Sequence, residues 1–253
     1  MNLRAAAALF GKEMLSQARS RRLPAALLAL LSIGVASPLM ARFAPGLLER
    51  MAAGVGVGFQ PPQPTWRDAM GHYAKYISQA GLFLLVLLSM GSVAAEKQRG
   101  TAAFLLSKPV PRSLFLAVKL ASSWAVAALA MVPSALGCAA CTLLLFSGLP
   151  LPHFLSLNLC LLLYLCSVLS LTLCCSTIGG NRAAAGALSF LAWFLLAGLA
   201  AIPGFGEFLP PRLAEAGLAS VSGAVSWKPF VGAGLLIASS LAAAAASLRR
   251  WEP

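Results

Sequence analysis

Six long apolar runs constrain the fold of this chain more than any other feature of its sequence. Each run has about 20 residues or more, the length that an α-helix needs to cross a hydrocarbon core about 30 Å thick. The runs are continuous rather than alternating, and Ala and Leu dominate them, which favours helices over the strands of a β-barrel. They cover residues 23–43, 77–95, 114–146, 154–178, 183–202 and 229–248.

Composition agrees with this interpretation. Only 10% of the 253 residues are charged and 59% are apolar, whereas a soluble domain has about 25% charged residues. The sequence therefore predicts an all-α polytopic membrane protein with six transmembrane helices, formed by a single domain over residues 1–253.

The distribution of Lys and Arg predicts the orientation. With the N-terminus in the cytoplasm, 13 of the 19 Lys and Arg fall in inside segments and six in outside segments. Positive residues are retained on the cytoplasmic side, so we expect both termini inside, in the inner membrane of the cell. The net charge of +12 then reflects topology. Nucleic-acid binding is disfavoured because no basic soluble domain is present to carry it.

The segment before the first run, residues 1–22, is predicted to form an amphipathic interfacial helix. Apolar residues recur at steps of three and four from Leu3 to Ala18, and its charged residues include Lys12, Glu13, Arg19 and Arg21. A basic leader that only sets topology is an alternative. A cleaved signal peptide is disfavoured because the first run exceeds the usual 7–15 apolar residues.

Of the segments predicted to lie outside, the two longer ones are the more informative. Residues 44–76 form the larger one, in which Thr65 and Asp68 have the capping-box spacing and predict a helix from Trp66 that continues into the second span. Trp66, Tyr73 and Tyr76 are then expected in the outer aromatic belt. The second segment, residues 203–228, is expected to hold a short interfacial or re-entrant helix near residues 211–219, with a surface loop as the alternative.

Several kinds of chemistry are disfavoured by the motifs that the sequence lacks. No nucleotide-binding, zinc-protease or serine-hydrolase motif occurs, so no catalytic residue is assigned and the chain is not expected to be an enzyme. The six cysteines all fall in apolar runs, where Cys behaves as a small hydrophobe, and no metal site is expected. No Asp or Glu lies in the middle of a run, which weakens a proton- or ion-coupled mechanism.

Residues 94–120, between the second and third runs, are the most informative segment for function. Glu96, Lys97, Arg99 and Gly100 precede an apolar stretch that contains Thr101, Phe104, Leu105 and Leu106 and ends at Pro109, before Arg112. The apolar side chains would be costly to leave in water, and a partner groove would bury them at about 25 cal/mol per Å². A docking helix near residues 97–107 is the predicted structure; a loop lying on the inner leaflet is the alternative.

This charged segment, together with the six runs and the N-terminal helix, resembles the ABC-2-type transporter permeases. The pattern of glutamate, charged residues, Gly-Thr, a Leu pair, Pro-Val and Arg is similar to theirs over residues 94–120. The chain looks most similar to the small permeases that pair with a separate ATPase, such as those of nitrous-oxide-reductase maturation and gliding motility.

The resemblance implies a cytoplasmic coupling helix at about residues 97–107 that inserts into a groove of a cytoplasmic ABC ATPase. It also implies a dimer of permeases over a dimer of ATPases, with ATP and Mg²⁺ bound by the partner and no cofactor on this chain. We expect an ATP-driven transport subunit in the lipid bilayer. A membrane anchor that transmits ATPase motion to a periplasmic machine, and a secondary transporter, are the alternatives.

Overall fold

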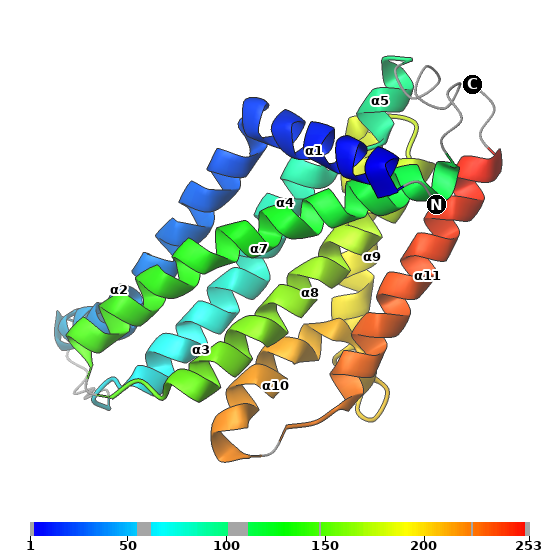
Figure 1. Ribbon diagram of the computed structural model, residues 1–253. Coiled ribbons are helices and arrows are strands. Elements are labelled where there is room, and N and C mark those ends of the chain that lie inside the picture. Colours follow the sequence, from blue (N-terminus) through cyan, green and yellow to red (C-terminus); the bar gives the residue numbers. More distant parts are fainter. Residues whose placement is uncertain (1–2, 55–61, 101–110, 147, 224, 251–253) are drawn as a thin grey trace.

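The computed structural model describes residues 3–54, 62–100, 111–146, 148–223 and 225–250, which are helices joined by turns (Figure 1). Six of the helices are long and apolar enough to cross a membrane, which confirms the predicted number. These six are Arg22–Gly54, Trp66–Gln98, Arg112–Leu145, Leu151–Ile178, Arg182–Leu199 and Lys228–Arg249.

The helices follow one another with few irregular residues between them. Their bounds are α1 (Leu3–Arg19), α2 (Arg22–Gly54), α3 (Trp66–Tyr76), α4 (Leu82–Ser89), α5 (Ala94–Gln98), α7 (Arg112–Leu145), α8 (Leu151–Ile178), α9 (Arg182–Leu199), α10 (Leu213–Ala219) and α11 (Lys228–Arg250). A π-helical segment, Ile77–Gly81, joins α3 to α4, and 3-10 turns lie at Gly206–Phe208, Pro210–Arg212 and Ser220–Ser222.

Helix α8 forms the centre of the bundle. It contacts α4, α7, α9, α10 and α11, and its Leu157, Leu161 and Leu165 are fully buried. The main apolar core is built around these side chains, with contributions from α2, α3, α4 and α7. Helices α4, α7, α9 and α11 therefore share α8 as a packing partner, whereas α2 packs mainly on α7 and α3.

The two ends of the bundle carry different elements. At one end, which we call the α1 end, α1 packs across α7, and α5, the start of α7 and the last turn of α11 lie at the same end of the bundle (Figure 1). The opposite end, which we call the α10 end, carries α10 and the start of α3 (Figure 1). The α1 end gathers most of the charged residues that the sequence singled out.

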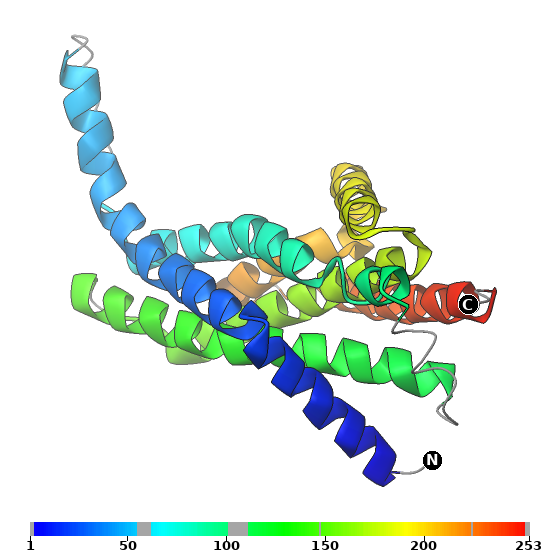
Figure 2. The ribbon, with the colours of Figure 1, turned by 90° about the horizontal axis from the view of Figure 1, so that it is seen from above.

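Helix α2 extends farther than the apolar run that predicts it. The helix continues to Gly54, although the sequence indicated a connection from Ala44, and it includes Pro38 and Pro45. Proline is tolerated inside membrane helices because neighbouring groups can satisfy the freed backbone. The last turns project away from the other helices (Figure 2), and Leu47, Leu48 and Met51 are exposed there.

The second span begins at Trp66, as the sequence predicted. The carboxylate of Asp68 accepts hydrogen bonds from the backbone N–H and the hydroxyl of Thr65, each at 2.8 Å. Tyr73 is not in an aromatic belt: its side chain is fully buried and its hydroxyl donates to Oδ1 of Asn158 at 2.9 Å. The expectation for Tyr73 was wrong because hydropathy does not distinguish an interfacial tyrosine from a buried one that has a polar partner.

A short helix lies in the segment between α9 and α11, as predicted. Leu213 of α10 is fully buried, and a Cβ added to Gly217 would lie 2.8 Å from a Leu157 methyl group, so α10 packs closely on α8. Beside it, Lys228 donates to Glu207 at 2.5 Å. That hydrogen bond and the charge of Lys228 lower the pKa of the Glu207 carboxyl below its usual range.

Candidate functional site

The candidate site is the charged α1 end, where the structure brings together two groups of residues that the sequence proposed separately. Glu96 and Lys97 lie in α5, Arg99 and Gly100 form the turn after it, and Arg112 begins α7. From the other group, Lys12, Glu13 and Arg19 lie on α1, and Arg21 lies in the turn between α1 and α2. The proposed Thr101, Phe104, Leu105, Leu106 and Pro109 lie outside the described residues, so the docking helix stays a prediction.

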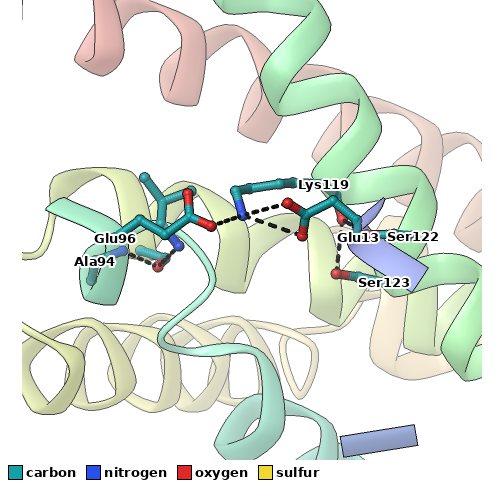
Figure 3. Close-up of polar contacts among 8 residues, drawn as sticks. Glu13, Ala94, Glu96, Lys119, Ser122 and Ser123 are labelled. Atoms are coloured by element: carbon teal, nitrogen blue, oxygen red, sulfur yellow. Dashed lines mark hydrogen bonds and ion pairs between the residues drawn. The ribbon is translucent and has the colours of Figure 1, made fainter. Parts of the chain in front are cut away.

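One buried lysine joins the two groups. Lys119, two turns into α7, is only 4% exposed, and its Nζ lies 2.7 Å from Oε1 of Glu96 and 3.4 Å from both carboxylate oxygens of Glu13 (Figure 3). A cation so buried needs opposite charges, because moving an ion out of water costs several kcal/mol. We call Glu13, Glu96 and Lys119 the ion triad. It connects α1, α5 and α7 at one point.

Hydrogen bonds to one serine of α8, Ser176, hold the backbone at the start of α5. The Ser176 hydroxyl accepts hydrogen bonds from the backbone N–H groups of Val93 and Ala94, at 3.1 and 3.0 Å, and donates to the carbonyl of Met90 at 2.8 Å. The first N–H groups of a helix have no partner within the helix, and here a side chain of another helix supplies one. Movement of α5 is thereby linked to the end of α8.

Two cationic side chains and one hydroxyl donate to backbone carbonyls at the C-terminal ends of α8 and α11. Lys97 donates to the carbonyl oxygen of Thr177 near the end of α8 at 2.5 Å, and Ser247 of α11 donates to the same oxygen at 3.2 Å. Arg112 donates to the carbonyls of Leu248 and Arg249 at the end of α11, at 2.8 and 3.1 Å. Cations are favoured at helix C-termini, where the carbonyls lack intrahelical partners. Both flanks of residues 101–110 are therefore attached to the ends of other helices.

The orientation of α1 differs from the simplest amphipathic interpretation. Ala7 and Ala18 are exposed, whereas Phe10, Glu13 and Met14 are partly buried. The helix is rotated so that Glu13 faces Lys119 of α7. This rotation depends on the attraction between Glu13 and Lys119, which lies on another helix. The spacing of apolar residues in α1 cannot predict it.

The turn after α1 is strained. Arg21 has a φ of 61°, in the left-handed region that a non-glycine residue rarely adopts. This residue separates α1 from α2, so the predicted helix over residues 1–22 ends at Arg19. The left-handed turn sets the direction in which α1 leaves α2 and crosses α7.

Sequence reasoning missed two residues that organise the site. Lys119 was assigned only to the start of the third run, and Ser176 was not singled out among the hydroxyl residues of α8. The signal for Lys119 was available, because a lysine seven residues into a membrane helix requires a partner. Ser176 had no comparable signal, since serines commonly bond to the carbonyl four residues earlier in their own helix.

The described residues contain no group of three or more His, Cys, Asp and Glu that could hold a metal ion. The chemistry of the α1 end is instead that of ion pairs and helix-end hydrogen bonds. Such contacts position elements relative to one another, and they do not by themselves carry a reaction.

Comparison with known proteins gives the family. None of the curated proteins compared with the chain matches it. The family model described as "ABC-2 family transporter protein" matches residues 7–231, a range that includes most of α1, the ion triad and the first five spans. The chain therefore belongs to the ABC-2 family of transporter membrane proteins.

Proposed function

We propose that the chain is the permease subunit of an ATP-driven transporter and that its segment from Ala94 to Arg112 docks on a separate cytoplasmic ATPase. Members of this family are in general membrane subunits that work with an ATPase partner. Within the family, the sequence of residues 94–120 is similar to that of the small permeases of nitrous-oxide-reductase maturation and gliding motility, and we propose a system of that kind. A second copy of the chain completes the complex.

One observation supports this role most strongly: the flanks of the proposed docking segment are anchored to four helices. The ion triad attaches α5 to α1 and α7, Ser176 attaches it to α8, and Arg112 attaches the start of α7 to the end of α11. A segment that receives force needs such attachments, because interfaces in packed helical structures move as units. A loop that merely joins two spans needs none of them.

Copurification tests the docking step. Phe104→Asp with Leu105→Asp places two charges in the predicted apolar face, and we expect the ATPase that copurifies with wild type to be lost. Leu15→Asp is the matched control, because Leu15 is an exposed apolar residue of α1 at the same end. Retention of the ATPase by the double variant, or equal loss with the control, would reject the docking segment.

The proposed orientation places the α1 end in the cytoplasm. It follows from the 13 of 19 Lys and Arg that lie in inside segments. Fusion of green fluorescent protein after residue 253 should give fluorescent cells, and alkaline phosphatase fused at Gly148 should be active. The reverse pattern would invert the topology and place residues 94–112 beyond the reach of a cytoplasmic ATPase.

Substrate-stimulated ATP hydrolysis in liposomes separates a transporter from a membrane anchor that only transmits motion. A cargo that raises the hydrolysis rate favours the transporter. A rate that no candidate cargo changes, while ATPase binding is intact, favours the anchor.

A further inference from the structure

A polar cavity adjoins the ion triad at the α1 end. It has a volume of about 320 Å³ and lies between α1, α2, α5 and α7. That volume falls at the lower end of the range of small-ligand sites, about 300–1,000 Å³. Its walls are unlike those of an ordinary apolar pocket, because charged residues and serines form most of them.

The cavity has an excess of positive charge. The ion triad contributes one net negative charge, and Lys12, Arg22 and Arg99 in the same walls contribute three positive charges. Arg182 adds to the positive field, since it repels Arg22 as Arg99 does, whereas Glu13 and Glu96 attract Arg22. The local field therefore favours an anion.

Arg22 lacks a partner that would use its hydrogen-bond donors. It is only partly exposed, yet among the described residues its guanidinium group has no hydrogen bond and no ion pair. Ser92, in the same wall, has a buried hydroxyl oxygen that also lacks a hydrogen-bond partner among those residues. Buried polar groups in proteins nearly always have partners. Arg22 and the buried Ser92 hydroxyl both line the cavity, so both have donors available for an acceptor that binds there.

The position of the cavity indicates what the acceptor is. Arg22 is the first residue of one span, and Glu96 and Arg99 lie at the end of the next. Because these residues lie at the ends of candidate spans, we place the cavity near the membrane surface, where the phosphates of lipid headgroups lie. The arginine fork matches phosphate oxygens in a bidentate manner, and basic pockets between membrane helices bind anionic headgroups.

We propose that this cavity is a binding site for a phosphate group, held by Arg22 and Arg99 with support from Lys12. The group belongs either to an anionic lipid headgroup or to a soluble phosphate ester. An occupant would contact α1, α2 and the end of α5 together, so it would stabilise the arrangement that the ion triad also holds. The proposal requires only that the chain spans a membrane and is independent of the docking of an ATPase.

The test uses the purified full-length chain in a neutral detergent, without any ATPase. Native mass spectrometry measures the binding of phosphatidylglycerol, with phosphatidylcholine as the uncharged comparison. We expect wild type to prefer phosphatidylglycerol, and Arg22→Gln with Arg99→Gln to weaken that binding at least tenfold. Arg42→Gln with Arg50→Gln is the matched control, because it removes the same charge from exposed positions in the distal half of α2.

Soluble probes identify the source of the phosphate. If glycerol phosphate or inorganic phosphate raises the melting temperature of wild type but not of the Arg22 and Arg99 variant, the site accepts a free phosphate. If only phosphatidylglycerol binds, the source is a lipid. Binding of phosphatidylglycerol that survives the Arg22 and Arg99 changes, or that falls equally in the Arg42 and Arg50 control, overturns the proposal, and so does a wild type that binds none of these probes.

A second variant protects the test against misfolding. Ser16 is exposed on α1 and lines the cavity, so Ser16→Phe obstructs the site without changing any charge. If the arginine variant does not yield folded protein, loss of phosphatidylglycerol binding in Ser16→Phe supports the site, and unchanged binding rejects it.

Discussion

At the scale of single residues, Lys119 determines how the α1 end is assembled. Its ammonium group lies between two carboxylates that come from α1 and α5, and it also lies 5.1 Å from the ring centroid of Phe115. A buried ion pair is not in itself stabilising, because the cost of removing charges from water offsets their attraction. The triad therefore specifies an arrangement of three helices more than it contributes net stability.

This interpretation predicts a non-additive series of variants. Lys119→Met leaves Glu13 and Glu96 close together without a cation, and should destabilise the protein by about 3 kcal/mol. Adding Glu13→Gln and Glu96→Gln removes all three charges and should restore most of that loss, since uncharged replacements of buried ion networks are often neutral. Melting curves of the full chain in detergent measure both steps. A triple variant less stable than Lys119→Met would contradict the interpretation.

The triad also shows what a single sequence can predict at this scale. Glu96, Lys97, Arg99 and Arg112 could be proposed from their place between two apolar runs, and they do lie together at one end. The pairing of Lys119 with Glu13 could not, because it depends on the left-handed turn at Arg21 and on the path of α1 across α7. Local spacing carries no information about such a crossing.

At the scale of elements, the attachment of α5 to α8 is the feature on which the proposed function depends. Helix α5 has only five residues, from Ala94 to Gln98, and a helix so short is not stable alone. The hydroxyl of Ser176 supplies hydrogen bonds that its N-terminus lacks. The short helix thus depends on its neighbour for its position.

Ser176→Ala should release α5. The change leaves two buried N–H groups without an acceptor, a cost of about 1–3 kcal/mol, so hydrogen exchange at Val93 and Ala94 should become at least five times faster. Ser189→Ala is the matched control, because the Ser189 hydroxyl is also buried and donates to the carbonyl of Ala185 in its own helix. Equal acceleration at Val93 in both variants would mean that Ser176 has no special role.

The packing of α2 on α7 gives a second prediction for elements. A Cβ added to Gly34 would lie 2.2 Å from the backbone oxygen of Ser134, so the two helices touch through that glycine. Gly34→Ala should push them apart and destabilise the protein by about 1–3 kcal/mol. Gly46→Ala, in the same helix but with no neighbour within 4 Å, should be neutral or slightly stabilising. Thermal melting distinguishes them, and similar melting temperatures would contradict the close approach.

The number of spans was predictable for a physical reason, and the length of α2 was not. Hydropathy identifies the segments whose side chains can face lipid, so the six apolar runs identify the six candidate spans. Beyond Phe43 the chain becomes more polar but stays helical to Gly54 through Pro45. Helical continuation outside an apolar run has no hydropathy signal.

At the scale of the whole molecule, the bundle is an all-helical membrane subunit of the ABC-2 family in which the ion triad joins α1, α5 and α7 at one end. No nucleotide-binding motif occurs in its sequence, and in our proposal a partner ATPase supplies the energy for transport. The α1 end has the anchored segment through which, in our proposal, that energy enters. The long helices that meet there extend to the α10 end, and they provide the route along which motion would pass.

Hydrogen exchange of the reconstituted complex, with and without ATP, tests this central claim most directly. Wild type bound to its ATPase should show an ATP-dependent change in exchange at Val93, at Ala94 and in the first turn of α7. Ser176→Ala should keep the ATPase bound but lose the change beyond α5. The account would be contradicted if ATP did not change hydrogen exchange at these amides in wild type while the ATPase stayed bound and hydrolysed ATP.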